Sequence, residues 1–412
     1  MKHFDIKKGA WPTSGHPPVQ QIAEAIRPRS VALLGTDFPN LRPRFAVQPG
    51  DAVTTGQALF HDRRHPEIAF VSPVHGTVTD LSYGPRRTLS ACILEVGKQG
   101  SDHPAMPKPD EIDDGSIRAT LLKRGFWPAF RTRPFGLTPA PTATPSAIFV
   151  NATQPSSHAA DPAVVLEGRQ DDFQRGVSIL TELTQGVVHI CQSRGPAFAA
   201  PSDRVETAIF SGSPAAGLSG THIDRLHRVG AGRQVWTIGY QDVIAIGHLF
   251  LSGRYEADRV VSVTGSAALN PRLVRSVLGA DLASLCQNAP VRGMSGNHLS
   301  GRDARFLGRF HDQVTLNNPA QSTAPVTWLA RMLGTHGALV PSAALENALA
   351  PDILPVPLMR ALSIGDCEAA ERSGCLALVE EDVAMLSRNC TSGAEYGALL
   401  RQVLDTLKEQ AA

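Results

Sequence analysis

The sequence predicts a multidomain protein of the α/β class. Its domains differ in character, so the organisation of the whole chain is α+β. Its 412 residues exceed the usual size of one domain, and 42% of them are hydrophobic against 19% charged, which is enough apolar material for several folded cores. The chain has 36 Gly and 31 Pro but only 6% aromatic residues. This balance favours short elements joined by many turns over long helical bundles.

The charge balance and the cysteines exclude several classes of protein. Lysine and arginine total 39 and aspartate and glutamate 38, so no overall field attracts nucleic acid or an anionic membrane surface. The N-terminus lacks the apolar segment of a signal peptide, and the longest apolar stretch, Val243 to Leu251, is about half of the roughly 20 residues that span a bilayer. The six cysteines lie at least eight residues apart. This spacing excludes a CxxC site for a metal or an iron–sulfur cluster and fits free thiols in a reducing cytoplasm.

Residues 1–97 are predicted to form a flattened β-sandwich. A strand at 30–34 is followed by turn glycines at Gly50 and Gly56 and by apolar residues spaced for strands with one buried face. The pattern GDxVxxGQxL with SPVHGTV resembles the biotinyl and lipoyl carrier domains. The hairpin HDRRHPEI has no lysine to carry a cofactor, so no swinging arm is expected. His61 and His65 in this hairpin lack a third metal ligand and are assigned to a solvated tip.

The rest of the chain divides into four parts. Residues 98–115 are polar and rich in proline, which predicts a linker. Residues 116–256 are predicted to form an α/β domain, residues 257–312 a small module of short strands, and residues 313–412 a helical region.

The α/β prediction depends on alternating helix and strand signals. SAIFVNA at 146–152 has the pattern of a buried strand, the helix signal from about Asp171 to Thr184 ends at Gly186, and VVHIC follows as a strand. This succession is what a parallel sheet with crossover helices requires.

Two glycine-rich loops do not meet the requirements of nucleotide binding. GSPAAGLSGTH has the spacing of a phosphate cradle but places Leu218 where a P-loop needs lysine. VGAGRQV places Val235 where a dinucleotide fold needs its third glycine. The sequence also has no GxSxG or HExxH motif, so no catalytic residue is assigned.

The segment GFWPAFRTRPF at 125–135 is a candidate for ligand binding. It places aromatic rings among arginines, and together these suit a flat ring with carbonyl oxygens, such as a quinone, through stacking and charge-assisted hydrogen bonds. The alternative is that the rings belong to a core or an interface between subunits and that the arginines pair with nearby carboxylates.

Segments along nearly the whole chain resemble one family. They follow in order as IKKG, VALLG, GDxVxxGQxLF, LLKRGFWPAFRTRPF, PSAIFVNAT, AAGLSGTH, YQDVIAIGHLFLSG, NPRLVRSVLGA, SGNHLSG and EYGALLRQVLD. On these segments the chain resembles the A subunits of Na+-translocating NADH:quinone (ubiquinone) oxidoreductases. The resemblance implies that the central domain is related to the flavin subunit of complex I and that the small module is β-grasp-like.

The resemblance also implies a location and partners. It places the chain on the cytoplasmic face of the bacterial inner membrane, docked on a membrane subunit in a complex with five other subunits that hold FMN, FAD and a 2Fe-2S cluster. Trp127, Pro128 and Phe130 fill the space that the flavin-binding relatives leave for the FMN phosphate. No cofactor is therefore expected in this chain.

Two segments depart from the family pattern. Residues 314–352 look shorter than the family's usual segment, and CTSGAEYG at 390–397 stands where the family has CPGKxEYG. These differences predict altered docking on the membrane subunits, as in a divergent paralogue that serves another redox complex.

The leading hypothesis is a peripheral subunit that contributes to the quinone site of a sodium-pumping NADH:ubiquinone reductase and has no independent activity. The complex would couple NADH oxidation by ubiquinone to Na+ export. The rival hypothesis is a purely structural docking subunit that never contacts quinone. The residues expected at the quinone are Trp127, Phe130, Arg131, Arg133 and Phe135, with His222, Tyr240, Gln241 and Asp242 as further polar candidates.

Overall fold

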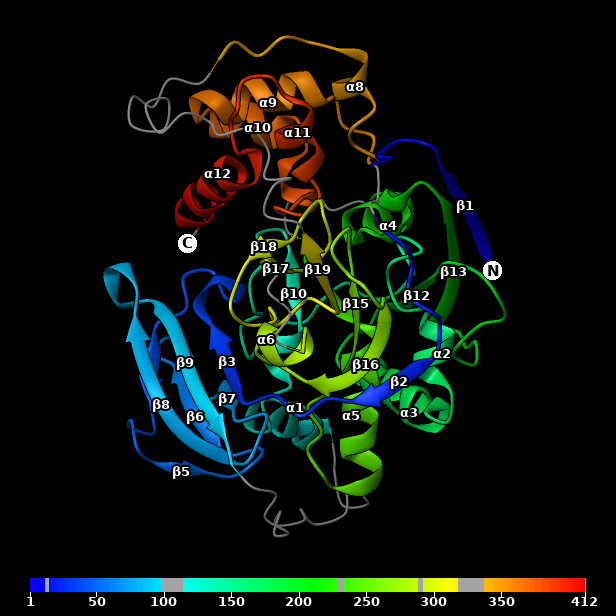
Figure 1. Ribbon diagram of the computed structural model, residues 1–412. Coiled ribbons are helices and arrows are strands. Elements are labelled where there is room, and N and C mark those ends of the chain that lie inside the picture. Colours follow the sequence, from blue (N-terminus) through cyan, green and yellow to red (C-terminus); the bar gives the residue numbers. More distant parts are fainter. Residues whose placement is uncertain (12–14, 98–113, 228–232, 288–291, 318–336, 412) are drawn as a thin grey trace.

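The computed structural model has the mixed α/β architecture that the sequence predicts (Figure 1). It combines a β-sandwich, a central α/β domain, a small β module and a group of C-terminal helices. Of the predicted linker, 98–115, all but the last two residues lie outside the described residues. The structure describes residues 1–411 apart from 12–14, 98–113, 228–232, 288–291 and 318–336.

The centre of the molecule is a six-stranded sheet in the order β1-β13-β12-β11-β14-β10. Neighbouring strands run parallel except β10, which is antiparallel to β14. The strands predicted at 146–152 and at VVHIC are β11 and β12. The bounds are Lys2–Ile6 (β1), Arg131–Arg133 (β10), Ala147–Ala152 (β11), Val187–Gln192 (β12), Val205–Gly212 (β13) and Val235–Gly239 (β14).

Both faces of this sheet are covered, which explains the continuous apolar runs in its strands. Along β11, Ala147 and Phe149 belong to a core shared with the C-terminal helices, whereas Ile148 and Val150 belong to a core shared with α3 and α5. Helices α3 and α5 pack against each other on that second face. The helices of this domain are α1 (Asp114–Lys123), α2 (Pro162–Leu166), α3 (Gln170–Glu182), α4 (Ser219–Leu226) and α5 (Tyr240–Ser252).

The N-terminal sandwich is built from two small antiparallel sheets, in the orders β3-β9-β8-β5 and β4-β6-β7. Phe60 and Phe70 stack in its core with ring centroids 4.7 Å apart. The hairpin between β6 and β7 exposes its arginines, while His61 and His65 are half-buried. The bounds are Ser30–Leu34 (β3), Pro43–Phe45 (β4), Ala52–Val53 (β5), Ala58–Asp62 (β6), Ala69–Val71 (β7), Gly76–Tyr83 (β8) and Leu89–Val96 (β9).

Two strands within the predicted N-terminal range of 1–97 pair with other parts of the fold. β1 adds to the edge of the central sheet, with Lys2–Ile6 paired to Ala208–Gly212. β2 (Ile22–Ala25) pairs in parallel with β16 of the small module. A short edge strand carries no local signal of a partner so far along the chain, so the sequence pattern could not assign either strand.

The small module is a six-stranded sheet in the order β18-β17-β19-β15-β16-β2. Its last strand, β19, pairs in parallel with β15 in the middle of the sheet and therefore belongs to the module. This strand lies beyond residue 312, where the sequence placed the end of the module. The other elements are β15 (Asp258–Thr264), β16 (Arg272–Val277), α6 (Leu282–Leu285), β17 (Arg292–Ser295), β18 (Arg302–Asp303) and β19 (Gln313–Asn317).

The C-terminal region is helical, and Figure 1 shows its helices gathered above β10 and α4. Its last helix is amphipathic and buries Tyr396, Leu400 and Leu404 among other apolar residues. No helix in the described ranges has both the length and the apolar character needed to cross a bilayer. The helices are α8 (Ala343–Glu346), α9 (Pro355–Ile364), α10 (Cys367–Arg372), α11 (Ala384–Asn389) and α12 (Tyr396–Gln410).

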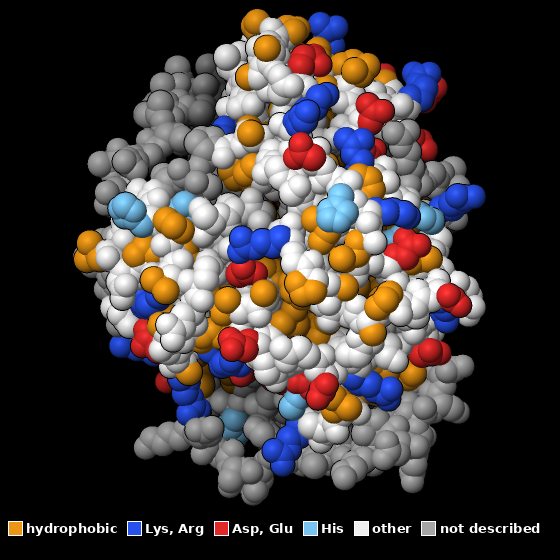
Figure 2. Space-filling model, turned by 90° about the vertical axis from the view of Figure 1, so that its right-hand side faces the viewer, with side chains coloured by type: hydrophobic (Ala, Val, Ile, Leu, Met, Phe, Trp, Pro, Cys, Tyr) orange, Lys and Arg blue, Asp and Glu red, His pale blue; other side chains and the backbone are white. Residues whose placement is uncertain are grey.

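The surface reflects the balanced composition. Figure 2 shows a face on which basic and acidic side chains are interspersed. Apolar side chains gather in a recess near the middle of this face.

Candidate functional site

The strand order places a gap at the carboxyl ends of β11 and β14. From β11 the chain passes to β12 and β13 on one side, and it then crosses to β14 on the other side of β11. At such a switch point the connections leave the sheet in opposite directions, and ligands of open α/β sheets bind in the gap between them. The residues that directly follow these two strands are therefore candidates for ligand contact.

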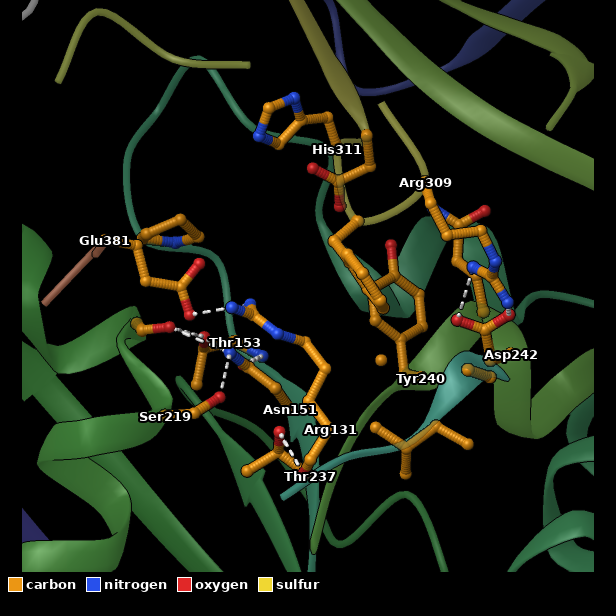
Figure 3. A pocket seen from close by; sticks show the side chains of 18 of the residues that line it. Arg131, Asn151, Thr153, Ser219, Thr237, Tyr240, Asp242, Arg309, His311 and Glu381 are labelled. Atoms are coloured by element: carbon orange, nitrogen blue, oxygen red, sulfur yellow. Dashed lines mark hydrogen bonds and ion pairs between the residues drawn. The ribbon is translucent and has the colours of Figure 1, made fainter. Parts of the chain in front are cut away.

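A cavity of about 200 Å³ occupies this gap (Figure 3). Its walls come from the ends of β11 and β14, the start of α5, strand β10, the small module and the C-terminal region. The volume is below the roughly 300–1,000 Å³ of pockets for drug-sized ligands. The cavity therefore suits a ligand of about one substituted ring.

Polar side chains after β11 bind one another. Asn151 donates from Nδ2 to the carbonyl of Gly217 at 2.8 Å, and Thr153 donates from Oγ1 to Asn151 Oδ1 at 2.6 Å. Ser219, the first residue of α4, lies 3.5 Å from Asn151 Nδ2. Because these groups already have protein partners, they fix the shape of the cavity wall.

Tyr240 differs from these residues, because its hydroxyl has no partner within the described part of the chain. The residue opens α5 and is 4% exposed. The amide of neighbouring Gln241 is committed to Val260 of β15, donating at 3.0 Å and accepting at 2.8 Å. Burial, together with the carboxyl groups of Asp312 and Asp161, raises the pKa of Tyr240 well above its usual value. A buried hydroxyl without an acceptor is costly, so an acceptor oxygen on a ligand would be stabilised here.

Asp242 is held between two guanidinium groups. Arg309 spans the carboxylate, with 3.1 Å from Nη1 to Oδ2 and 2.7 Å from Nη2 to Oδ1, and Arg259 also binds Oδ1. Burial raises the pKa of Asp242, but Arg259 and Arg309 outweigh it and hold that pKa below its usual value. This ionised triad joins α5 to the small module.

Arg131 and Phe310 form another wall. The guanidinium of Arg131 lies 5.0 Å from the centroid of the Phe310 ring, and its Nη1 is 3.5 Å from Glu381 Oε1 of the C-terminal region. The Arg131 side chain remains partly exposed. The cavity thus has an aromatic ring and a cation on the same side.

The predicted quinone contacts divide into two groups, of which Arg131, Tyr240, Gln241 and Asp242 line the cavity. Trp127 and Phe130 instead lie in the core. Both are fully buried, and the centroid of each ring lies 5.3 Å from that of Trp236. Trp127 Nε1 donates to the carbonyl of Pro139 at 2.8 Å. For these two rings the structure matches the alternative of a core position.

Arg133, Phe135 and His222 also lie outside the cavity. Arg133 is fully buried and ion-paired with Asp382 at 3.5 Å, and Phe135 is half-buried against the C-terminal helices. His222 is fully buried, with Nε2 2.7 Å from the carbonyl of Ala216. Arg133 thus ties β10 to the C-terminal region, whereas His222 is held within its own part of the chain.

Several cavity residues were not identified from the sequence. Arg259, Arg309, Phe310 and Asp312 come from the small module, and only the tertiary fold brings them to the switch point. Asn151 carried a usable signal, because polar residues directly after a buried strand of a parallel sheet often line a site.

Comparison with known proteins decides the family. Residues 4–97 match the NqrA N-terminal barrel-sandwich hybrid domain, residues 112–255 the NqrA second alpha/beta domain, and residues 260–305 the NQRA C-terminal domain. The A subunit of the Na(+)-translocating NADH-quinone reductase of Neisseria meningitidis serogroup C is 38% identical over 448 aligned positions, which cover 98% of this chain and 99% of that protein. The chain belongs to this family of A subunits.

Other members of the family are similar over the same extent. The A subunits of Pasteurella multocida and Shewanella amazonensis are each 36% identical over 445 positions, covering 98% of this chain and 99% of theirs. These alignments have more positions than the 412 residues of the chain, so it is shorter than its relatives in at least one segment. The segment 314–352 is predicted to be the shortened one, and part of it lies outside the described residues.

An NAD+-reducing [NiFe]-hydrogenase in the air-oxidized state has a TM-score of 0.39 at 12% identity, covering 72% of this chain and 61% of the hydrogenase chain. Among the residues that the structure describes, no three His, Cys, Asp or Glu side chains are grouped to hold a metal ion.

Proposed function

We propose that the chain is the peripheral A subunit of a sodium-pumping NADH:ubiquinone reductase and that its switch-point cavity binds the ubiquinone headgroup. In this role it docks from the cytoplasmic side on a membrane subunit, in a complex with five other subunits. The complex oxidises NADH with ubiquinone and exports Na+, while this chain has no activity on its own. Membership of the A-subunit family supports the assembly, and the cavity supports the quinone.

The unpartnered hydroxyl of Tyr240 is the observation that carries the quinone assignment. A quinone headgroup is a flat ring with two carbonyl oxygens, both of which are acceptors. Tyr240 donates to one carbonyl, the guanidinium of Arg131 polarises the other, and Phe310 stacks on the ring. The cavity of about 200 Å³ matches the headgroup rather than the whole lipid.

The redox groups belong to the partner subunits in this proposal. An FMN phosphate in a site of the complex I type needs free backbone amides. Here the amide of Ala129 donates to the carbonyl of Phe126, that of Phe130 donates to Trp127, and Pro128 has no N–H. We therefore place FMN, FAD and the 2Fe-2S cluster in other subunits and none in this chain.

Photolabelling of the intact complex tests the quinone assignment. A photoreactive ubiquinone analogue should label peptides containing Arg131, Tyr240 or Phe310, and excess ubiquinone should suppress the label. Label found only on the membrane subunit would contradict the proposal. It would favour the purely structural docking subunit or a divergent paralogue in another redox complex.

Replacing Tyr240 by phenylalanine provides a quantitative version of the same test. The Y240F change removes one hydrogen bond, whose net contribution is about 0.5–1.5 kcal/mol, so the Kd of a short-chain ubiquinone should rise about 2- to 12-fold. The matched control is Y83F, because Tyr83 lies half-exposed on the sandwich, away from the cavity. Equal affinities of the two variants would contradict the role of Tyr240.

A further inference from the structure

The imidazole of His311 is held along one of its edges. The residue lies on the loop before β19, and its amide donates to the carbonyl of Gly308 at 3.1 Å. Its Nδ1 is 2.8 Å from Oγ of Ser295, the last residue of β17. Glycines lie against the same edge, since a Cβ at Gly296 would be 3.2 Å from Cε1 and a Cβ at Gly308 2.9 Å from Nδ1. The ring is therefore packed against β17 and its own loop through its Nδ1–Cε1 edge.

Ser295 decides which ring nitrogen of His311 carries the proton. Its side chain is fully buried, and its Oγ accepts from the amide of Gly308 at 2.8 Å. Among the described residues, Nδ1 of His311 is the one acceptor within reach of the serine hydroxyl. A proton on Nδ1 would leave that hydroxyl without an acceptor, which is costly for a buried group. The neutral ring therefore carries its proton on Nε2.

The Nε2–H of this ring faces the cavity. His311 lines the cavity, and the Nδ1–Cε1 edge is the one packed against β17. Figure 3 shows the ring directed away from Arg309 and Asp242, toward the side of the cavity that Glu381 and Arg131 form. Nε2 has no hydrogen-bond partner in the part of the chain that the structure describes. The cavity thus has a second unpartnered donor besides the hydroxyl of Tyr240.

This second donor is neutral. Burial lowers the pKa of His311 to about 4, and Arg302 acts in the same direction, so the imidazole is uncharged at pH 7. A neutral ring with its proton on Nε2 donates one hydrogen bond from that nitrogen and accepts none there. The oxygen that fits it is therefore an acceptor, such as a carbonyl.

We propose that His311 binds the quinone by donating from Nε2–H to the carbonyl oxygen that Arg131 polarises, and that Ser295 positions it by fixing the tautomer. The proposal rests on the quinone site proposed above and adds a contact to it. A carbonyl oxygen has two lone pairs, so it can accept from His311 and face the guanidinium of Arg131 together. The other carbonyl accepts from Tyr240. Each oxygen of the headgroup then has a hydrogen-bond donor from a different domain.

Nitrogen-15 NMR tests the tautomer without any quinone. In the full chain labelled at its histidines, His311 should show the shifts of a neutral ring protonated at Nε2, and its signal is identified by its loss in H311Q. The S295A variant should show both tautomers, because Nδ1 then has no fixed donor. A ring protonated at Nδ1 in the wild type would overturn the proposal.

Quinone binding tests the contact itself. His311→Phe keeps a flat ring but removes the donor, so the Kd of a short-chain ubiquinone for the intact complex should rise about 2- to 12-fold, the effect of one hydrogen bond. His311→Gln restores an N–H at a similar reach and should bind within about twofold of the wild type. The matched control is His3→Phe, which changes an exposed histidine outside the cavity. Equal affinities of H311F and the wild type would overturn the contact.

A double-mutant cycle tests whether Ser295 acts through His311. If S295A leaves the two tautomers equally populated, half of the molecules present the donor, and the Kd should rise about twofold. In the H311F background the same change should have no effect, because no tautomer remains to be fixed. An equal loss in both backgrounds would show a merely structural role of Ser295 and overturn its positioning role.

The infrared spectrum of the bound quinone provides a signature that a structural role would not produce. A carbonyl that accepts a hydrogen bond absorbs at lower frequency, so one C=O band should move to higher frequency in H311F and stay in place in H311Q. Unmoved bands in H311F would overturn the contact and leave the quinone site in place. Failure of the wild-type complex to bind or to be labelled by quinone in this cavity would overturn the site as well.

Discussion

Replacing Asp382 by asparagine should loosen the contact between β10 and the C-terminal region. Nη2 of the buried Arg133 lies 3.5 Å from Asp382 Oδ2 and 3.7 Å from Glu381 Oε1. Asparagine has nearly the same size and keeps an acceptor for the amide of Val379, which donates to Asp382 Oδ2 at 2.9 Å. The substitution therefore removes the main counter-charge of Arg133 and little else.

The magnitude follows from the burial of the guanidinium. Removing one partner of a buried ion pair costs about 3–5 kcal/mol, because the other charge stays buried without compensation. Glu381 remains near Arg133, so the lower end, about 3 kcal/mol, applies. At about 1.4 kcal/mol for each factor of ten, the opened state should become roughly a hundredfold more populated.

Amide hydrogen exchange in residues 131–135 and 379–382 measures this opening. At pH 8 the carboxyl group of Asp382 is ionised, because burial raises its pKa only to about 6. The control E368Q breaks an exposed ion pair with Arg372 in the same region and should leave exchange unchanged. Exchange in D382N within about threefold of the wild type would refute the reasoning.

Two further predictions concern the central domain. Burial lowers the pKa of His222 to about 4, so this histidine binds a proton more tightly in the unfolded chain than in the folded one. The stability that the neutral His222 contributes is present above pH 6.5 and is lost as the pH falls toward 4. Between pH 7 and pH 5 the wild type should therefore lose about 2 kcal/mol more stability than H222Q. Chemical denaturation at the two pH values measures this difference, and the same pH dependence in both proteins would contradict it. Gly247→Ala would place a Cβ 1.7 Å from the carbonyl oxygen of Asp172, separating α5 from α3, and should lower the stability by more than about 2 kcal/mol. Gly397→Ala in α12 meets only ordinary contacts, so thermal melting of the two variants should differ clearly.

The sequence predicts those elements of the fold whose signal is local. The apolar run at 146–152 became β11, and the periodic segment from about Asp171 became α3, because a strand covered on both faces and an amphipathic helix each mark themselves by their pattern. The two N-terminal strands were missed, since their pairing partners lie in other domains.

The candidate site was predictable only in its central-domain part. Tyr240 and Asp242 follow a strand of the parallel sheet, which is where such sheets bind ligands. The segment with Trp127 and Phe130 attracted attention by its composition, but large rings fit a core equally well, and composition cannot distinguish the two. Arg309 and Phe310 reach the cavity through the packing of a different domain, for which no local pattern exists.

The placement of β1 and β2 has a consequence for how the chain is made. Strands β1 and β2 belong to sheets whose other strands are synthesised much later, since β1 pairs with β13 and β2 with β16. The central sheet and the small module therefore cannot be completed during early synthesis, and the sandwich that follows these strands can fold while they still lack partners. Deleting the segment from β1 to β2 would act on the edges of two distant domains at once.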